Sequence, residues 1–153
     1  MPGAGIYARN VASIDRFVQI GVANRRVISL SFPETPDPSA TADHEILDWI
    51  EGYLDGEHTD VTEIDVGLTV PTDQRAVLER VREIPYGEQF PLDRLVAHTP
   101  GLDPAEESDM ETARTALAEN PVPILIPDHR VTGIDGGTPP AIRQTLQRIE
   151  SRN

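Results

Sequence analysis

The segment from Asn120 to Val131, NPVPILIPDHRV, constrains the fold more than any other part of the chain. Three prolines flank an apolar run, and Asp128, His129 and Arg130 follow it. Proline fixes φ and cannot donate to a β-ladder, so we expect the side chain at position 128 to be held rigidly beside a core strand. Two interpretations are open: Asp128 caps the next turn beside a satisfied core histidine, or position 128 carries a reactive group.

The absence of cysteine limits the available chemistry. With no cysteine in 153 residues, disulfides, thiolate catalysis and cysteine-ligated zinc are excluded. The histidines do not stand at metal-ligand spacing, and we therefore expect neither a metal nor another cofactor. The four are His44, His58, His98 and His129.

The charged residues are unusual in number and in kind. Twenty-six acidic residues stand against 13 basic ones, all of which are arginine. Hydrated carboxylates keep a protein dispersed in concentrated salt, so the pattern favours a halophile over an acidic mesophilic protein that prefers arginine. The net charge of -13 does not by itself exclude nucleic acid. No segment is apolar enough to span a bilayer and no secretion signal is recognisable, so we expect a cytoplasmic protein without a membrane partner.

The amino-terminal half predicts strands followed by one helix. Residues 5–32 predict two or three short strands, and the second and third stretches are separated by a turn at residues 23–25, which predicts an antiparallel hairpin. The proline-rich residues 33–43 predict a surface loop. Apolar residues at helical spacing predict a helix over residues 46–54, with Gly56 after its end. Residues 61–70 alternate, and we expect a further strand there.

The carboxy-terminal half predicts helices. Residues 72–84 have one apolar face and Thr72 as a possible N-cap, and PYGEQF predicts a turn. A short helix should open with Pro91 and end near Gly101, and another should cover residues 107–120. Two short helices after a longer one have the outline of a helix-turn-helix, although helical hairpins without a nucleic-acid role share this pattern.

Within residues 84–131 the chain resembles the alkylguanine-DNA alkyltransferase family and its non-catalytic branch, the alkyltransferase-like proteins. The family signature reads proline, cysteine, histidine, arginine, valine after an asparagine-proline pair and an apolar run, and only the cysteine differs here. Further similarity lies in IPYGE and ALAEN. The resemblance implies an α+β fold: an amino-terminal lobe, residues 1–70, with an antiparallel sheet and a helix, and a winged-helix-like helix-turn-helix lobe, residues 71–153.

The resemblance also implies a mechanism for the family. A recognition helix enters the minor groove, one of its arginines fills the gap left by a flipped base, and a tyrosine of the preceding helix helps to rotate the nucleotide. The base then meets a thiolate, which a histidine activates through a water and a glutamate.

Carried over to this chain, the roles fall on altered residues. Asp128 stands at the nucleophile position, whereas His129 is retained and Glu150 matches the network glutamate. The arginine position falls on Glu111 and the tyrosine position on Leu92. After GIDGG the chain continues directly into TPPAIRQTLQRIE, so the residues that wall the family's base pocket are missing and we expect a truncated pocket.

The positions that the resemblance places at or near nucleic acid are Leu92, Glu111, Arg114, Asn120 and Arg130. Between residues 103 and 119, however, six acidic residues accompany a single arginine, which opposes phosphate neutralisation. The six are Asp103, Glu106, Glu107, Asp109, Glu111 and Glu119.

Three functions are therefore open, and the sequence leaves enzymatic activity undecided because the acceptor cysteine is absent. The first is non-catalytic recognition of alkylguanine or other lesions in double-stranded DNA, together with repair proteins. The second is protein interaction or regulation without DNA. The third is acceptance of an alkyl group by Asp128 itself.

Overall fold

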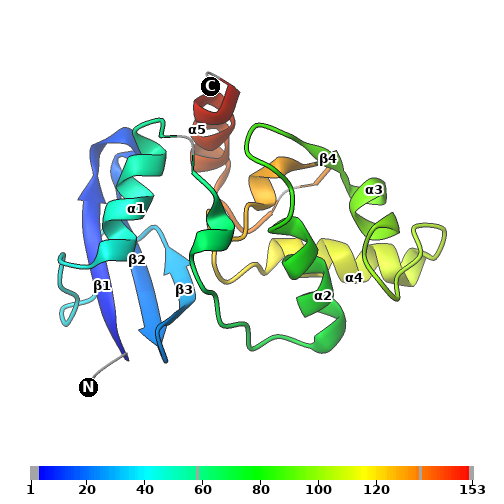
Figure 1. Ribbon diagram of the computed structural model, residues 1–153, viewed down its shortest axis with the longest axis horizontal. Helices are drawn as coiled ribbons and strands as arrows, with labels where there is room; N and C mark the ends of the chain where they lie inside the picture. Colours follow the sequence, from blue (N-terminus) through cyan, green and yellow to red (C-terminus); the bar gives the residue numbers. More distant parts are fainter. Residues whose placement is uncertain (1–3, 58, 135, 152–153) are drawn as a thin grey trace.

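A computed structural model describes residues 4–57, 59–134 and 136–151, so His58 of the sequence analysis lies outside the described residues. The sheet and α1 lie on one side of the molecule, α2, α3 and α4 lie on the other, and α5 stands between them (Figure 1). The fold is α+β, as predicted. The boundary between residues 70 and 71 stays a prediction.

The sheet confirms the predicted antiparallel strands. It consists of β1 (Ala4–Val11), β2 (Arg16–Ala23) and β3 (Arg26–Ser31) in the order β1-β2-β3. Asn24 and Arg25 have φ values of 52° and 64°. A two-residue hairpin turn with positive φ at both positions matches the right-handed twist of the strands that it joins.

Helix α1 (Glu45–Leu54) packs its apolar face towards the sheet. His44 is its N-cap, and its Nδ1 accepts a hydrogen bond from the amide of Ile46 at 3.0 Å. Gly56 follows the helix with a φ of 101°, which suits a glycine just beyond a helix end. The expected proline-rich loop follows β3, and its Thr41 forms a bridge with Tyr7 of the outer strand β1.

The strand expected over residues 61–70 is wrong. The structure has a 3-10 turn, η2 (Val61–Glu63), and a single bridge between Val66 and Val27. The reason is that Arg82 takes the backbone carbonyls of Val61 and Ile64, each at 2.5 Å, so these groups do not join a β-ladder. The alternating pattern therefore belongs to an extended linker with one contact to the sheet.

The helices of the second half are α2 (Thr72–Val81), α3 (Leu92–Ala97) and α4 (Glu107–Ala118), and α2 contacts both others. The expected N-cap at Thr72 is wrong: Pro71 holds that position without a side-chain bond, and Thr72 is the first helical residue. Pro91 likewise precedes α3, which ends at Ala97 rather than near Gly101. A glycine with a φ of 85° at position 101 turns the chain towards α4 instead.

A short parallel pair of strands belongs to the second half of the chain. β4 (Phe90–Pro91) pairs with β5 (Val131–Thr132), and α5 (Pro140–Ser151) ends the described chain. No helix within the described ranges is both long and apolar enough to cross a bilayer.

Candidate functional site: the surroundings of Asp128

The apolar run of the proline-rich segment forms a tight turn, so the core strand expected there is wrong. Ile124 has a φ of 74°, and Pro123 forms a bridge with Ile126 only three residues later. The run is nevertheless completely buried. A residue from another segment also holds the turn, because Nε of Arg82 donates to the carbonyl of Leu125 at 3.1 Å.

Asn120 links the end of α4 to this turn. Its Nδ2 donates to the carbonyl of Ile126 at 2.9 Å and to Oδ2 of Asp128 at 2.8 Å, and its Oδ1 accepts from the amide of Val122 at 3.0 Å. The side chain is buried and uses both of its polar atoms internally. Its role here is to hold the turn against position 128.

Asp128 is completely buried (0% exposed). Its Oδ2 accepts from Asn120 and from the amide and hydroxyl of Thr138, at 3.3 and 3.1 Å. Arg143 Nη1 lies 3.7 Å from Oδ1. The interpretation of Asp128 as a cap is wrong, because the 3-10 turn η3 (Asp128–Arg130) has no side-chain cap. Burial raises the pKa of the carboxyl group, although the hydrogen bonds from Asn120 and Thr138 oppose the rise.

The chain beyond β5 closes over this carboxylate. A Cβ atom at Gly136 would lie 2.4 Å from Oδ1 of Asp128, closer than atoms can approach. The amide of Gly137 donates to the carbonyl of Leu117 at 2.7 Å. Three surface cavities of about 400 to 500 Å³ are lined by other residues, and Asp128 borders none of the three. The truncated base pocket that the family resemblance implies stays a prediction.

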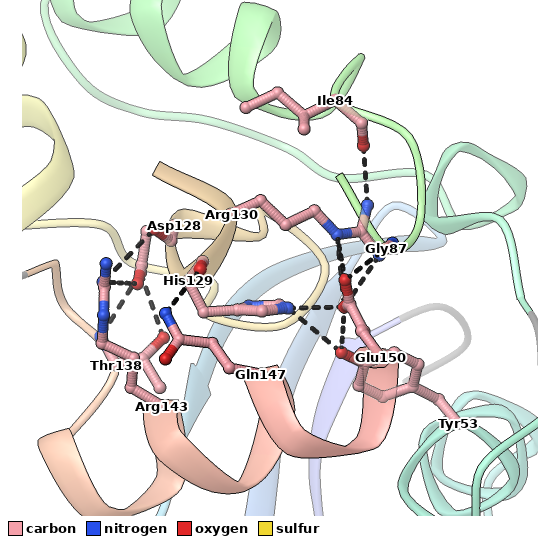
Figure 2. A network of polar contacts seen from close by, with 10 residues as sticks. All are labelled: Tyr53, Ile84, Gly87, Asp128, His129, Arg130, Thr138, Arg143, Gln147 and Glu150. Atoms are coloured by element: carbon pink, nitrogen blue, oxygen red, sulfur yellow. Dashed lines mark hydrogen bonds and ion pairs between the residues drawn. The ribbon is translucent and has the colours of Figure 1, made fainter. Parts of the chain in front are cut away.

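On the far side of η3, His129 and Glu150 meet as the resemblance implied (Figure 2). Nε2 of His129 lies 2.6 Å from Oε2 of Glu150 without an intervening atom. Arg130 donates to the same carboxylate through Nε and Nη2, and the amide of Gly87 donates to its Oε1. Burial favours a raised pKa for Glu150, but the hydrogen bonds and charges of His129 and Arg130 outweigh it and lower the pKa to about 2.

Tyr53 also belongs to this network, and the sequence analysis missed it. Its hydroxyl donates to Oε2 of Glu150 at 2.5 Å and lies 3.1 Å from Nε2 of His129. Burial and the neighbouring carboxylate raise the pKa of Tyr53, so the phenol stays protonated. Its only signal in the sequence is its place on the buried face of α1, next to Ile50 and Leu54.

Three of the positions assigned to nucleic acid lie inside the protein. Leu92 is 8% exposed and belongs to the hydrophobic core. Arg130 is 2% exposed, and its Nη1 donates to the carbonyl of Ile84 at 2.7 Å in addition to its bonds with Glu150. Asn120 is buried as described above. Leu92 and Asn120 are therefore not available to a ligand on the surface. Arg130 lines two of the cavities, but it is already bonded to Glu150 and Ile84.

The other two positions lie together on α4. Glu111 is exposed, and its carboxylate lies 3.0 Å from Nη1 of Arg114. Glu107 lies 2.8 Å from the same nitrogen. The single arginine of this helix is thus shared between two carboxylates, and the exposed face of α4 keeps a net negative charge. No group of three or more possible ligands within the described ranges could hold a metal ion.

Comparison with known proteins identifies relatives in DNA repair, although no family model matches the chain. The methylated-DNA–protein-cysteine methyltransferase of Methanopyrus kandleri is 33% identical over 93 residues, which cover 61% of this chain and 66% of the relative. The protein of that name from Archaeoglobus fulgidus is 31% identical over 103 residues, 67% of this chain and 65% of the relative. The similarity therefore spans about two thirds of the relatives' length.

Solved structures share the fold over nearly the whole chain. Mycobacterium tuberculosis OGT in complex with DNA has a TM-score of 0.78 at 21% identity, with 96% of this chain and 93% of that chain covered. The O6-methylguanine-DNA methyltransferase of Pyrococcus kodakaraensis has a TM-score of 0.69 at 19% identity, with 95% and 99% covered. Sequence similarity to the curated relatives and the shared fold agree with the signature around Asp128, and the chain belongs to the alkylguanine-DNA alkyltransferase family.

Proposed function

We propose that this chain is a non-transferring, alkyltransferase-like member of its family that acts by recognition. The observation that carries the proposal is the state of Asp128 at the nucleophile position, which is fully buried and bound through Oδ2 by Asn120 and Thr138. A carboxylate whose oxygen is held by several donors is a weak nucleophile, and an acceptor must also be reachable. Both conditions oppose alkyl transfer to Asp128.

The same site also argues against a flipped base. Chemistry on a base requires a pocket that receives it once it has left the stack. Here the backbone of Gly136 lies against the Asp128 carboxylate, and Gly137 is bonded to Leu117. Recognition would therefore use the outer surface of the protein.

The first candidate partner is double-stranded DNA with alkylated guanine or another lesion. Kinship with DNA repair methyltransferases and the retained pair α3 and α4 support it. Shape and backbone contacts are sufficient to position a protein on a duplex without reading a flipped base. The acidic, lysine-free composition supports action in a salt-rich cytoplasm, where phosphate repulsion is screened.

A titration of fluorescent duplexes at molar potassium chloride tests this candidate. One duplex carries methylguanine, the matched one carries guanine, and intact-mass analysis of the protein follows each incubation. We expect tighter binding of the lesion duplex and no gain of mass. Equal binding of both duplexes would contradict lesion recognition. A gain of about 14 daltons in the mass of the protein, which corresponds to one transferred methyl group, would overturn the non-transferring assignment.

The second candidate is a protein partner without DNA, and the charge of α4 favours it. Arg114 is held by Glu107 and Glu111, so that this helix offers carboxylates where a DNA-binding helix needs cations. Affinity purification at molar potassium chloride, with and without nuclease, distinguishes the two. Partners that survive nuclease treatment support this candidate, and partners that all disappear support DNA.

A further inference from the structure

The surroundings of Asp128 form a built carboxylate-binding site that the chain itself occupies. Four groups from three segments converge on the carboxylate: Nδ2 of Asn120 after α4, the amide and hydroxyl of Thr138, and Nη1 of Arg143 on α5 (Figure 2 shows Thr138 and Arg143). Asn120 and Thr138 are buried. Donors of this kind are costly to bury unless an acceptor faces them.

These contacts join the end of α4, η3 and the residues before α5, and other bonds link the same segments. Arg143 also donates to the carbonyls of Asp128 and Val131, at 3.3 and 2.5 Å, which ties η3 to α5. Thr138 lies two residues before the start of α5, and Gly137 is bonded to Leu117 near the end of α4. The carboxylate is therefore the common acceptor between the end of α4 and the start of α5.

We propose that Asp128 is a latch, whose carboxylate acts as an internal ligand and closes the site at the former nucleophile position by holding Gly136–Thr138 down. The proposal rests on the non-transferring function proposed above. In this role Asp128 accepts hydrogen bonds from Asn120 and Thr138 that a thiol at the same position would not accept as well. The emptied site would take a small carboxylate, of which formate is the simplest.

Replacement of Asp128 with alanine and addition of formate test the latch. In D128A we expect hydrogen exchange at the amides of Gly137 and Thr138 to become at least about tenfold faster, since the loss of such buried bonds costs more than 1 kcal/mol. Potassium formate should restore slow exchange and part of the lost melting temperature in D128A. Potassium chloride of equal concentration should not, and the exposed-site control D43A should respond equally to both salts.

Two further variants keep the proposal falsifiable if D128A does not fold. D128N keeps an acceptor oxygen but loses the charge, and exchange at Gly137 and Thr138 should be faster in it than in the parent. T138V removes the hydroxyl alone, and in combination with D128N it should add little, because both changes weaken one contact. Additive effects of the two changes, or an exchange at Gly137 that no Asp128 variant alters, would overturn the latch.

The same experiments separate the latch from the proposed function. A failure of formate to restore D128A removes the latch and leaves the binding and mass results as they are. A methyl adduct on the parent protein removes the non-transferring function, whatever the exchange rates are.

Discussion

The Nε2 atom of His129 lies 2.6 Å from Oε2 of Glu150, and both side chains are buried. In the mechanism that the family resemblance implies, this pair serves the activation of a thiolate. Here the thiolate is absent, yet Glu150 also accepts from Tyr53, Arg130 and Gly87. A carboxylate that is buried with so many donors cannot be lost without leaving them unpaired, which gives a structural reason for the pair to persist.

The first prediction concerns Glu150. E150Q should lower the free energy of unfolding by about 3–5 kcal/mol, because it leaves Arg130 buried without its counter-ion. The control is E88Q, a change of the same kind at an exposed position. Denaturant titration in concentrated salt measures both, and a cost for E150Q as small as that for E88Q would contradict the structural role of the network.

The pH dependence of stability should follow from the same carboxylate. The pKa of Glu150 is lowered from 4.5 to about 2, so its contribution is present above pH 4.5 and is lost as the pH falls from there to 2. The raised pKa of Asp128 has the opposite effect on stability: the free energy of unfolding that it contributes is lost as the pH rises. We therefore expect the difference in unfolding free energy between the parent and E150Q to shrink below pH 4.5. A constant difference down to pH 2.5 would contradict the lowered pKa.

Restoring the thiol alone should not restore transfer. In D128C the sulfur would still lie beneath Gly136–Thr138, and α4 would still carry Glu111 at the position where the family resemblance implies an arginine. Intact-mass analysis after incubation with a methylguanine duplex should show no more than a few per cent of methylated protein. The control is an active family member under the same conditions, and near-complete methylation of D128C would disprove the closure of the site.

Charge reversal on α4 should create DNA affinity. E111R removes one carboxylate beside Arg114, which keeps Glu107, and adds a cation to the exposed face that should be available to phosphates. We expect at least a tenfold gain, about 1.4 kcal/mol, in the affinity for duplex DNA at low salt, with a steeper salt dependence. E63R, on the linker turn η2, is the matched control. Equal gains for the two variants would show that total charge, not α4, governs DNA binding.

Gly136 should tolerate no side chain while Asp128 is present. G136A places a methyl group within 2.8 Å of three atoms of Asp128, so we expect a loss of about 1–3 kcal/mol in unfolding free energy. In a D128G background the obstructing atoms are gone, and the cost of G136A should largely disappear. Thermal or denaturant unfolding of the four proteins measures this coupling. An unchanged cost in D128G would show that Gly136 is required for another reason.

The sequence predicted the elements whose signals are local. A short apolar stretch predicted β2, helical spacing predicted the buried faces of α1 and α4, and the turn before β3 followed from its residues. The strand predicted in the linker after α1 was wrong because extended chain without a β-partner shows the same alternation. Two backbone carbonyls of this linker accept hydrogen bonds from Arg82 and do not join a sheet. The core strand predicted around Ile124 was wrong because a short apolar run has the same sequence pattern in a strand and in a buried turn.

The sequence alone determined that no thiol chemistry takes place and that the residues of one family signature surround position 128. Only the tertiary structure decided what Asp128, Arg130 and Asn120 do, since each is buried and bonded to groups from distant segments. Whether a polar side chain faces solvent or other donors depends on contacts between those segments, and the spacing of residues along the chain does not encode it. The structure therefore changed Arg130 from an expected nucleic-acid contact into the buried partner of Glu150.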